Sequence, residues 1–283
     1  MKNKLSRFAV PYVVWMAIFV VAPILIMVLY AFSNGEGGAT LSNFVQMGDY
    51  AAVFGRSFKL ALIATAICLL IGYPVSYYLS REGASFQRTA MVLIMLPMWM
   101  NFLLRTYSWM TILENNGLLN QLFQKIGLIA LYNQLTGSNL EYFSMINTQG
   151  AVVLGMVYNY LPFMILPIYS VIVKLDYSLL EAARDLGANN VTVFRKVILP
   201  LSLPGVLSGI TMVFVPSVST FAISRMLGGG SNLLIGDLIE MQFLGNSYNL
   251  NVGSAMSLVL MIIVLLCMSF TSSFDEDEME GVS

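Results

Sequence analysis

Residues 173–204 read VKLDYSLLEAARDLGANNVTVFRKVILPLSLP, a charged and turn-rich connection between two long apolar runs. Ser178 and Glu181 have the spacing of a capping box, in which the two side chains satisfy backbone N–H groups of the first helical turn. Apolar residues around them recur at helical spacing and mark one face: Leu179, Leu180, Ala183 and Leu186. The segment therefore predicts an amphipathic helix that begins near Ser178.

Signals for a sharp turn and a second helix follow this first helix. Gly187 can adopt the positive φ that commonly ends a helix. Asn189 or Asn190 can cap a second short helix that runs to Pro200. The connection, residues 174–203, is therefore predicted to be a helix–turn–helix that lies along the membrane surface.

The composition of the whole chain indicates a membrane protein. The 283 residues are 58% hydrophobic and 10% charged, with a mean hydropathy of +0.77, whereas a soluble domain carries about a quarter charged residues. The 14 basic and 15 acidic residues leave a net charge of −1, so a nucleic-acid partner is not expected. His is absent, which removes His-based catalysis and most zinc or haem sites. Cys68 and Cys267 lie in apolar runs far from each other, so neither a disulfide framework nor a metal cluster is expected.

Six apolar runs are long enough to cross a bilayer, which needs about 20 residues of helix. They cover residues 8–32, 58–80, 90–112, 148–173, 204–226 and 252–273. Prolines inside them are expected to kink the helices rather than break them, because neighbouring helices satisfy the freed carbonyls. The first run is too long for a signal peptide and is expected to be retained. The predicted fold class is an all-α integral membrane protein with six transmembrane helices, in a single domain that covers residues 1–283.

The positive-inside rule places both termini on the cytoplasmic side. In that orientation nine basic residues fall inside the cell and four fall outside. The helix–turn–helix then lies in the cytoplasm. The outer connection, residues 113–147, is expected to hold short amphipathic helices at the membrane surface, and residues 274–283 form an acidic cytoplasmic tail.

The helix–turn–helix carries the spacing of a known motif. The pattern is Glu-Ala-Ala, three residues, Gly, nine residues, an aliphatic residue, one residue, Leu-Pro, and here it consists of Glu181, Ala182, Ala183, Gly187, Val197, Leu199 and Pro200. It resembles the EAA loop of ABC importer permeases, with Val197 in the place of an isoleucine. A bare EAA triplet would be far less specific than this full spacing between two spans.

The resemblance implies that the first short helix is a coupling helix, which docks into a cleft of a cytoplasmic ATPase subunit. In that role Ala182 and Ala183 permit close approach of the two chains. Polar contacts at the edge of the contact would come from Glu181, Arg184 and Asp185. The alternative is a hairpin that only closes the helix bundle, with Glu181 serving as a cap.

The likeness extends from the first span to about residue 270. Stretches such as LALIATAICLLIGYPVSYYLS, LPMWMNFLLRTYSW and SNLLIGDLIEMQFL resemble the PotB-type permeases of bacterial spermidine/putrescine importers. This resemblance implies a type I importer (MetI-like) permease fold, a place in the bacterial inner membrane and a polyamine substrate. It also implies the partners: a second homologous permease, two ATP-binding cassette ATPase subunits that bind ATP and Mg²⁺, and an extracytoplasmic polyamine-binding protein. This chain would then be non-catalytic and would hold no cofactor of its own.

A route for a flexible polycation needs aromatic faces and carbonyls that bind weakly enough to release it. Trp99 and Asn101 lie near the middle of the third predicted span, and Trp109 lies near its outer end. Tyr158 and Tyr160 lie within the fourth span. These five residues are candidates for the substrate pathway. The alternatives are an aromatic belt at the membrane interface for Trp109 and hydrogen bonds between helices for the two tyrosines.

Two acidic residues and one arginine complete the candidates. Asp237 and Glu240 follow a glycine-rich turn and could line the mouth of the pore, or they are ordinary solvated loop charges. Arg105, within the third span, would repel a cation in the pore. We expect it to have a structural role, either extending toward the outer headgroups or pairing with an outer carboxylate.

Other functions account for less of the sequence. An ion-driven secondary transporter generally keeps ionisable residues near the middle of the membrane, and among the predicted spans only Arg105 is such a residue. An intramembrane enzyme would need catalytic groups, but His and the signatures H-E-x-x-H and G-x-S-x-G are absent. Within the importer class, another small substrate stays open as an alternative to a polyamine.

Overall fold

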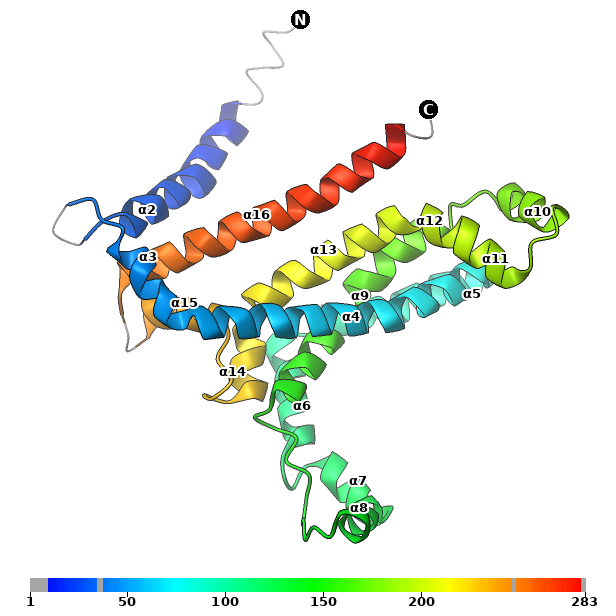
Figure 1. The fold of residues 1–283 in the computed structure, drawn as a ribbon, viewed down its shortest axis with the longest axis horizontal. Helices are drawn as coiled ribbons and strands as arrows, with labels where there is room; N and C mark the ends of the chain where they lie inside the picture. Colours follow the sequence, from blue (N-terminus) through cyan, green and yellow to red (C-terminus); the bar gives the residue numbers. More distant parts are fainter. Residues whose placement is uncertain (1–9, 35–37, 246–247, 281–283) are drawn as a thin grey trace, which may run out of the picture. The chain divides into compact units, whose positions relative to one another are not determined.

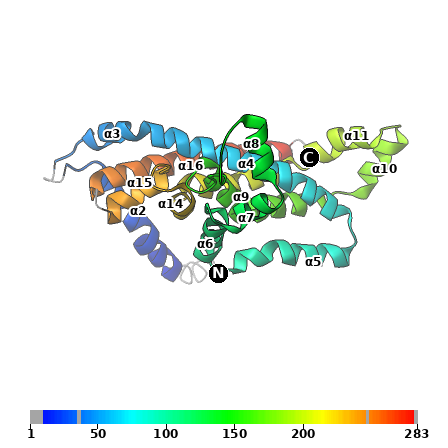
Figure 2. The same cartoon turned by 90° about the horizontal axis from the view of Figure 1, so that it is seen from below.

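The computed structural model describes residues 10–34, 38–245 and 248–280, and it is helical almost throughout (Figures 1 and 2). Within these residues the one extended pairing is a bridge between Ser33 and Ala39. The all-α fold class is therefore confirmed for the described part of the chain.

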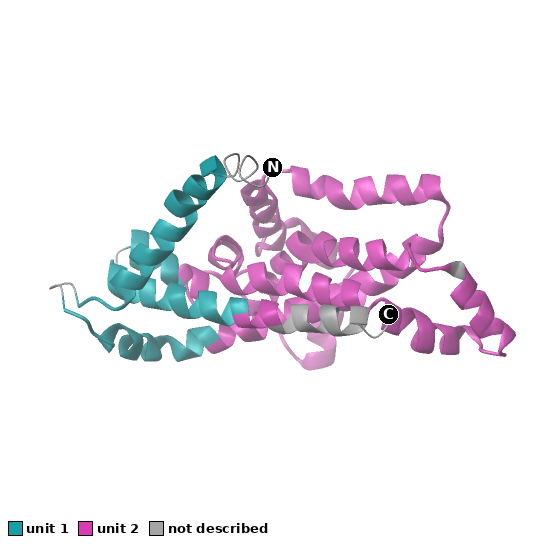
Figure 3. Cartoon of the chain, turned by 90° about the horizontal axis from the view of Figure 1, so that it is seen from above, with its two compact units in different colours: residues 1–54, 238–265 teal, residues 55–237, 266–283 magenta. Residues whose placement is uncertain are grey.

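The chain forms two compact units (Figure 3), residues 1–54 with 238–265 and residues 55–237 with 266–283. The boundary falls inside three helices, each of which is continuous across it: α4 (Ala51–Arg81), α15 (Ile235–Leu244) and α16 (Leu250–Glu280). The single domain expected from the sequence stays a prediction.

The smaller unit is built around the first and last long helices. The first is continuous over Val10–Ala31 and ends in α2 (Ala22–Ala31), and α3 (Ser42–Met47) follows it. Its core is formed by the buried side chains of Ala31, Ala255 and Leu258. The buried Asn43 amide donates to the carbonyl oxygens of Ala31 and Ser33 at 2.9 Å each, which ties α3 to the end of α2.

The larger unit holds the rest of the helices. In chain order they are α5 (Ala84–Met95), the 3₁₀ turn η3 (Leu96–Trp99), α6 (Phe102–Leu113), α7 (Leu118–Lys125), α8 (Leu128–Thr136), α9 (Gln149–Ile172), α10 (Tyr177–Asp185), α11 (Asn190–Val193), the π turn η4 (Phe194–Ile198), α12 (Leu199–Leu201), α13 (Leu203–Ser219) and α14 (Ala222–Gly228). The helices α7 and α8 confirm that the connection 113–147 holds short helices.

The core of the larger unit is the contact between α9 and α13 (Figure 1), and small residues bring their backbones together. A Cβ atom on Gly205 would lie 2.9 Å from the carbonyl oxygen of Pro167. One on Gly209 would lie 2.8 Å from the sulfur of Met164. Glycine is therefore required at Gly205, where the neighbour is backbone, whereas at Gly209 the Met164 side chain would have to shift.

Four of the six predicted spans are confirmed as continuous helices long and apolar enough to cross a membrane: Val10–Ala31, Ser42–Arg81, Gln149–Ile172 and Leu250–Ser269. Residues 8 and 9 of the first predicted span lie outside the described residues. The last helix continues through residues 274–280 of the acidic tail, whose final residues 281–283 also lie outside them.

The third predicted span is broken, so the expectation of a kink at Pro97 is wrong. Ala84–Trp99 and Phe102–Lys125 meet at 88°. Pro97 lies in the 3₁₀ turn η3 and has no N–H to continue a helix. The Asn101 side-chain oxygen then accepts hydrogen bonds from the backbone N–H groups of Leu103 (2.9 Å) and Leu104 (3.3 Å), and thereby starts a new helix.

The fifth predicted span, 204–226, is also divided. Its helix α13 ends at Ser219, Thr220 has extended backbone with ψ 142°, and α14 begins at Ala222. A Cβ atom on Gly236 would lie 2.5 Å from the carbonyl oxygens of Ser219 and Thr220. The start of α15 thus packs directly against the backbone at this break, where a continuous helix was expected.

Candidate functional site

The predicted helix–turn–helix is present, but its first cap differs from the prediction. Asp176, and not Ser178, is the N-cap of α10, and its carboxylate accepts the Ser178 backbone N–H at 2.9 Å. A carboxylate is favoured at this position because it faces the positive end of the helix dipole. The hydrogen bonds from the backbone and side chain of Ser178 lower the pKa of Asp176 below its ordinary value. The capping box of Ser178 and Glu181 is therefore wrong.

The turn after α10 confirms the prediction for Gly187. Its φ is +83°, and nothing lies within 4 Å of where its Cβ would be, so the backbone and not the available space requires glycine here. Asn189 then caps α11, because its side-chain oxygen accepts the Thr192 N–H at 2.8 Å. Of the two asparagines left open, Asn189 is the cap.

The four apolar residues of α10 that were predicted to mark one face differ in burial. Leu180 and Ala183 are half-buried, whereas Leu179 and Leu186 are 49% and 90% exposed. A helix advances by about 100° per residue, so two residues seven apart lie within about 20° of each other. Leu179 and Leu186 consequently form one outward apolar face. The other motif residues of α10 are also exposed, as are two residues further along: Glu181, Ala182, Arg184, Asp185, Leu199 and Pro200.

Three of the aromatic candidates gather between α6, α9 and α13. The Trp109 and Tyr158 rings meet edge to face, with centroids 5.4 Å apart. The Tyr160 hydroxyl donates to the Pro216 carbonyl oxygen at 3.4 Å. Trp99 is 75% exposed, and Asn101 serves as the cap of α6. The structure thus brings Trp109 and Tyr158 together and leaves Trp99 and Asn101 on an exposed bend.

Arg105 is buried beside this cluster, so the expectation that it extends to the headgroups is wrong. Only 8% of the residue is exposed, and its guanidinium carbon lies 6.0 Å from the centroid of the Tyr158 ring. Within the described part of the chain its Nε and Nη1 atoms are buried and make no hydrogen bond. A buried arginine with open donor groups is costly unless a further partner or ligand satisfies it.

Asp237 is fully buried, so the alternative of a solvated loop charge is wrong for it. Its Oδ2 accepts the Leu234 backbone N–H at 2.8 Å, and the Ser57 hydroxyl of α4 accepts the Ile235 N–H at 2.8 Å. These two contacts cap the start of α15. Glu240 is half-buried further along the same helix. A place in the substrate pathway stays a prediction for both residues.

Residues 72–275 match the family of binding-protein-dependent transport system inner membrane components. The chain belongs to this family. It is 37% identical over 273 residues to the spermidine/putrescine transport system permease protein PotB of Haemophilus influenzae, which covers 93% of this chain and 92% of that protein. It is 36% identical over 258 residues to PotB of Escherichia coli K12, which covers 88% of this chain and 90% of that one.

A solved structure shares the fold. A bacterial ABC transporter involved in the import of the acidic polysaccharide alginate contains a chain with a TM-score of 0.73, at 16% identity and over 95% of each chain. The type I importer permease fold is therefore confirmed, and the chain is a multi-pass, non-catalytic membrane component of a transport system. The matched region of the family includes the helix–turn–helix and every candidate pathway residue.

Two features of this region are absent from the predictions made from the sequence. The Asp176 cap had a usable signal, since an aspartate directly before an amphipathic run favours an N-cap. The second feature is that Arg81, at the end of α4, shares a cavity with Arg184 of α10. No local pattern predicts this, because the two residues lie far apart in the sequence.

Proposed function

We propose that this chain is the membrane-spanning permease subunit of an ATP-driven importer for polyamines such as spermidine and putrescine. In this role it forms half of the translocation pathway beside a second homologous permease. Two cytoplasmic ATPase subunits bind ATP and Mg²⁺, and an extracytoplasmic binding protein delivers the substrate. The polyamine substrate is supported by the two permeases at 37% and 36% identity, both named for spermidine/putrescine transport.

The outward face of α10 is the single observation that carries this proposal. A large apolar side chain that is 90% exposed, Leu186, lies among charged residues on a helix that is too short and too polar to enter the bilayer. An apolar centre with a polar rim is the usual composition of a protein interface. Asp185 lies at the edge of this face, whereas Arg184 lies about 160° from Leu186 around the helix axis and lines the inner side of α10. This face fits the cleft of an ATPase subunit, and the positive-inside rule supports its place in the cytoplasm, with both termini on the same side.

The aromatic pair Trp109 and Tyr158 suits the transfer of an ammonium group. Cation–π attraction to such rings contributes about 1–2 kcal/mol when the site is desolvated, which holds a cation without trapping it. Tyr160 lies two residues further along the same helix, about 160° around its axis from Tyr158, and its hydroxyl donates to the Pro216 carbonyl oxygen. Trp99 is exposed at the end of η3, where it is available to the second permease.

Arg105 favours a second candidate, an importer of the same class whose substrate carries a carboxylate. Its buried guanidinium has two donor groups that no described residue satisfies, and a carboxylate is the group that arginine binds best. A polyamine would be repelled at the same place. The two candidates differ in the charge of the ligand and are therefore easy to separate.

The test is to reconstitute the chain with its second permease, ATPase and binding protein in liposomes and to measure ATP hydrolysis and uptake together. Spermidine and putrescine are expected to stimulate both, and a dicarboxylate is expected to stimulate neither. Stimulation by the dicarboxylate alone would establish the second candidate. Uptake that persists without ATP and without the ATPase would overturn the importer assignment in favour of an ion-driven transporter.

A further inference from the structure

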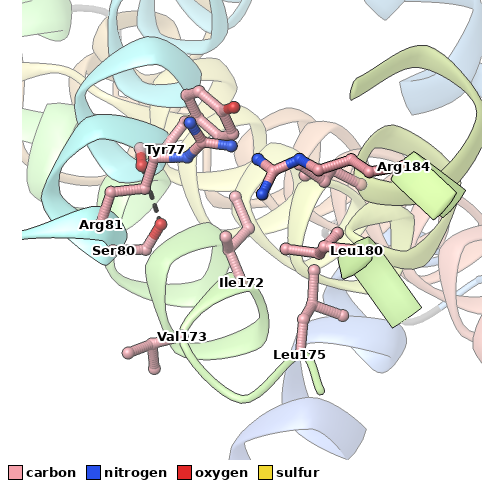
Figure 4. A pocket seen from close by; sticks show the side chains of 9 residues that line it. Tyr77, Ser80, Arg81, Ile172, Val173, Leu175, Leu180 and Arg184 are labelled. Atoms are coloured by element: carbon pink, nitrogen blue, oxygen red, sulfur yellow. Dashed lines mark hydrogen bonds between the residues drawn. The ribbon is translucent and has the colours of Figure 1, made fainter. Parts of the chain in front are cut away.

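A cavity of about 460 Å³ lies where α10 meets the ends of α4 and α9 (Figure 4). Its walls come from Tyr77, Ser80 and Arg81 of α4, from the end of α9, and from Leu180 and Arg184 of α10. All these segments belong to the larger unit. The cavity therefore connects the proposed coupling helix to two membrane-spanning helices.

Two arginine side chains enter this cavity from opposite walls. The Arg81 guanidinium lies over the Tyr77 ring, 4.4 Å from its centroid, and Figure 4 shows the Arg184 guanidinium pointing toward it. Among the described residues no carboxylate forms an ion pair with either of them. Two like charges that share a cavity repel each other. An anion held between them attracts both, and these two attractions outweigh the repulsion. Guanidinium groups bind phosphate through paired, charge-assisted hydrogen bonds.

The remaining wall of the cavity is apolar. Ile172, Leu175 and Leu180 line it beside the two arginines. Arg81 is the last residue of α4 and Ile172 is the last residue of α9, so the cavity lies at the depth where two spans leave the membrane. A soluble phosphate would satisfy the arginines and leave this aliphatic wall uncovered. A phospholipid would satisfy both, because its phosphate adjoins its acyl chains.

We propose that this cavity binds a phosphate anion, the headgroup phosphate of an anionic phospholipid such as phosphatidylglycerol. Basic pockets between membrane-spanning helices are known physical hosts for such headgroups. The bound phosphate joins Arg184 on α10 to Arg81 on α4, so the lipid becomes part of the connection between them. The inference that the lipid binds depends on the cavity alone. The inference that the bound lipid affects transport depends also on the proposed function.

The binding test uses the full permease complex in detergent and native mass spectrometry. Phosphatidylglycerol is expected to remain bound in preference to phosphatidylcholine. Arg81→Gln and Arg184→Gln are each expected to lower its affinity about tenfold, since each removes one charged hydrogen-bond donor. The matched control is Arg88→Gln, an exposed arginine on α5 that does not line the cavity, and it is expected to bind as the wild type does.

Each other outcome overturns the proposal in a distinct way. Equal retention of the two lipids, or unchanged binding in both variants, would show that no headgroup site exists. Displacement of phosphatidylglycerol by millimolar inorganic phosphate would assign the site to a soluble anion. Loss of the lipid when the ATPase subunits bind would assign the arginines to an acidic group of that partner.

Uptake measured in the same preparations separates this inference from the proposed function. Wild-type complexes that transport equally well in pure phosphatidylcholine contradict a role of the bound lipid in transport and leave the importer intact. Complexes that bind phosphatidylglycerol selectively but do not hydrolyse ATP in response to any substrate contradict the importer and leave the lipid site intact.

Discussion

Replacing Leu186 by Ala tests the coupling face at its most exposed apolar residue. Because Leu186 is 90% exposed, the substitution removes very little packing within the chain itself. If docking buries this side chain, the three carbon groups that are lost contribute about 0.8 kcal/mol each. Allowing for the small part that is already covered, the expected loss is about 2 kcal/mol of docking free energy, or about 30-fold in affinity.

The assay measures the affinity of the ATPase subunit for permease complexes in nanodiscs, with substrate uptake as the second readout. The matched control is Leu135→Ala, which truncates a leucine that is 77% exposed on α8, away from α10 (Figure 1). The control is expected to bind the ATPase as the wild type does. An affinity of Leu186→Ala within threefold of the control would refute the assignment of this face to the ATPase.

Three further predictions follow from the backbone and its caps. Because the pKa of Asp176 is lowered, its cap stabilises α10 above the ordinary aspartate pKa and is lost as the pH falls through the lowered value. The hydrogen-exchange protection of α10, corrected for intrinsic exchange, should therefore fall in acid. The variant Asp176→Asn keeps a hydrogen-bond acceptor but does not titrate, so its protection should show no such fall. An identical acid response in the wild type and the variant would contradict the role of Asp176 as a titrating cap. Gly187→Val forces a β-branched residue to φ +83°, at a cost of about 1–2 kcal/mol, and we expect an inserted subunit that no longer supports uptake. Gly83→Val, at φ −64° and with open space around it, should transport normally, and equal uptake by the two variants would show that the turn is not required. Gly205→Ala places a Cβ 2.9 Å from the Pro167 carbonyl oxygen and is expected to destabilise the chain by roughly 1–3 kcal/mol. The control Gly55→Ala has nothing within 4 Å of the added Cβ and should not lower the melting temperature in detergent. The same melting temperature for both variants would argue against close packing of α9 and α13.

The features that the sequence predicted well are those set by local chemistry. The predicted fourth span covers residues 148–173, and α9 covers Gln149–Ile172. The agreement is close because a long apolar run in a membrane satisfies its backbone hydrogen bonds by forming an α-helix. The sequence predicts Gly187 at the turn and narrows the second cap to Asn189 or Asn190, because a positive φ and an N-cap each restrict the residue type strongly. These signals need no knowledge of the neighbouring helices.

The helix breaks were missed because they depend on tertiary surroundings. Pro97 and Pro216 both lie in apolar runs, yet the chain breaks just after Pro97 and only at Thr220 in the other span. An exposed backbone group at either break is tolerated only where another part of the protein lies against it, as the start of α15 does at Thr220. Asn101 was the one local signal, since a polar N-cap residue after a proline favours a new helix.

The buried charges show the same limit more sharply. For Arg105 the sequence leaves two structural roles open, an extension toward the headgroups or a pairing with an outer carboxylate. Its burial against Tyr158 depends on where α6 packs on α9, and Asp237 is buried because Ser57 and the end of α13 close around the start of α15. Composition reports that such residues are present, but only packing decides whether water reaches them.

The division of α10 into two faces gives a physical reason why it can transmit force. Leu180 and Arg184 are four residues apart and both line the cavity at the ends of α4 and α9, whereas Leu179 and Leu186 point outward. The two faces are separated by roughly 100–160° around the helix axis. A partner that holds the outer face therefore moves α10 as a rigid body of nine residues. That movement either carries the ends of α4 and α9 with it or pulls Leu180 out of its cavity, and the second outcome exposes apolar surface. The ends of the spans should thus follow the coupling helix.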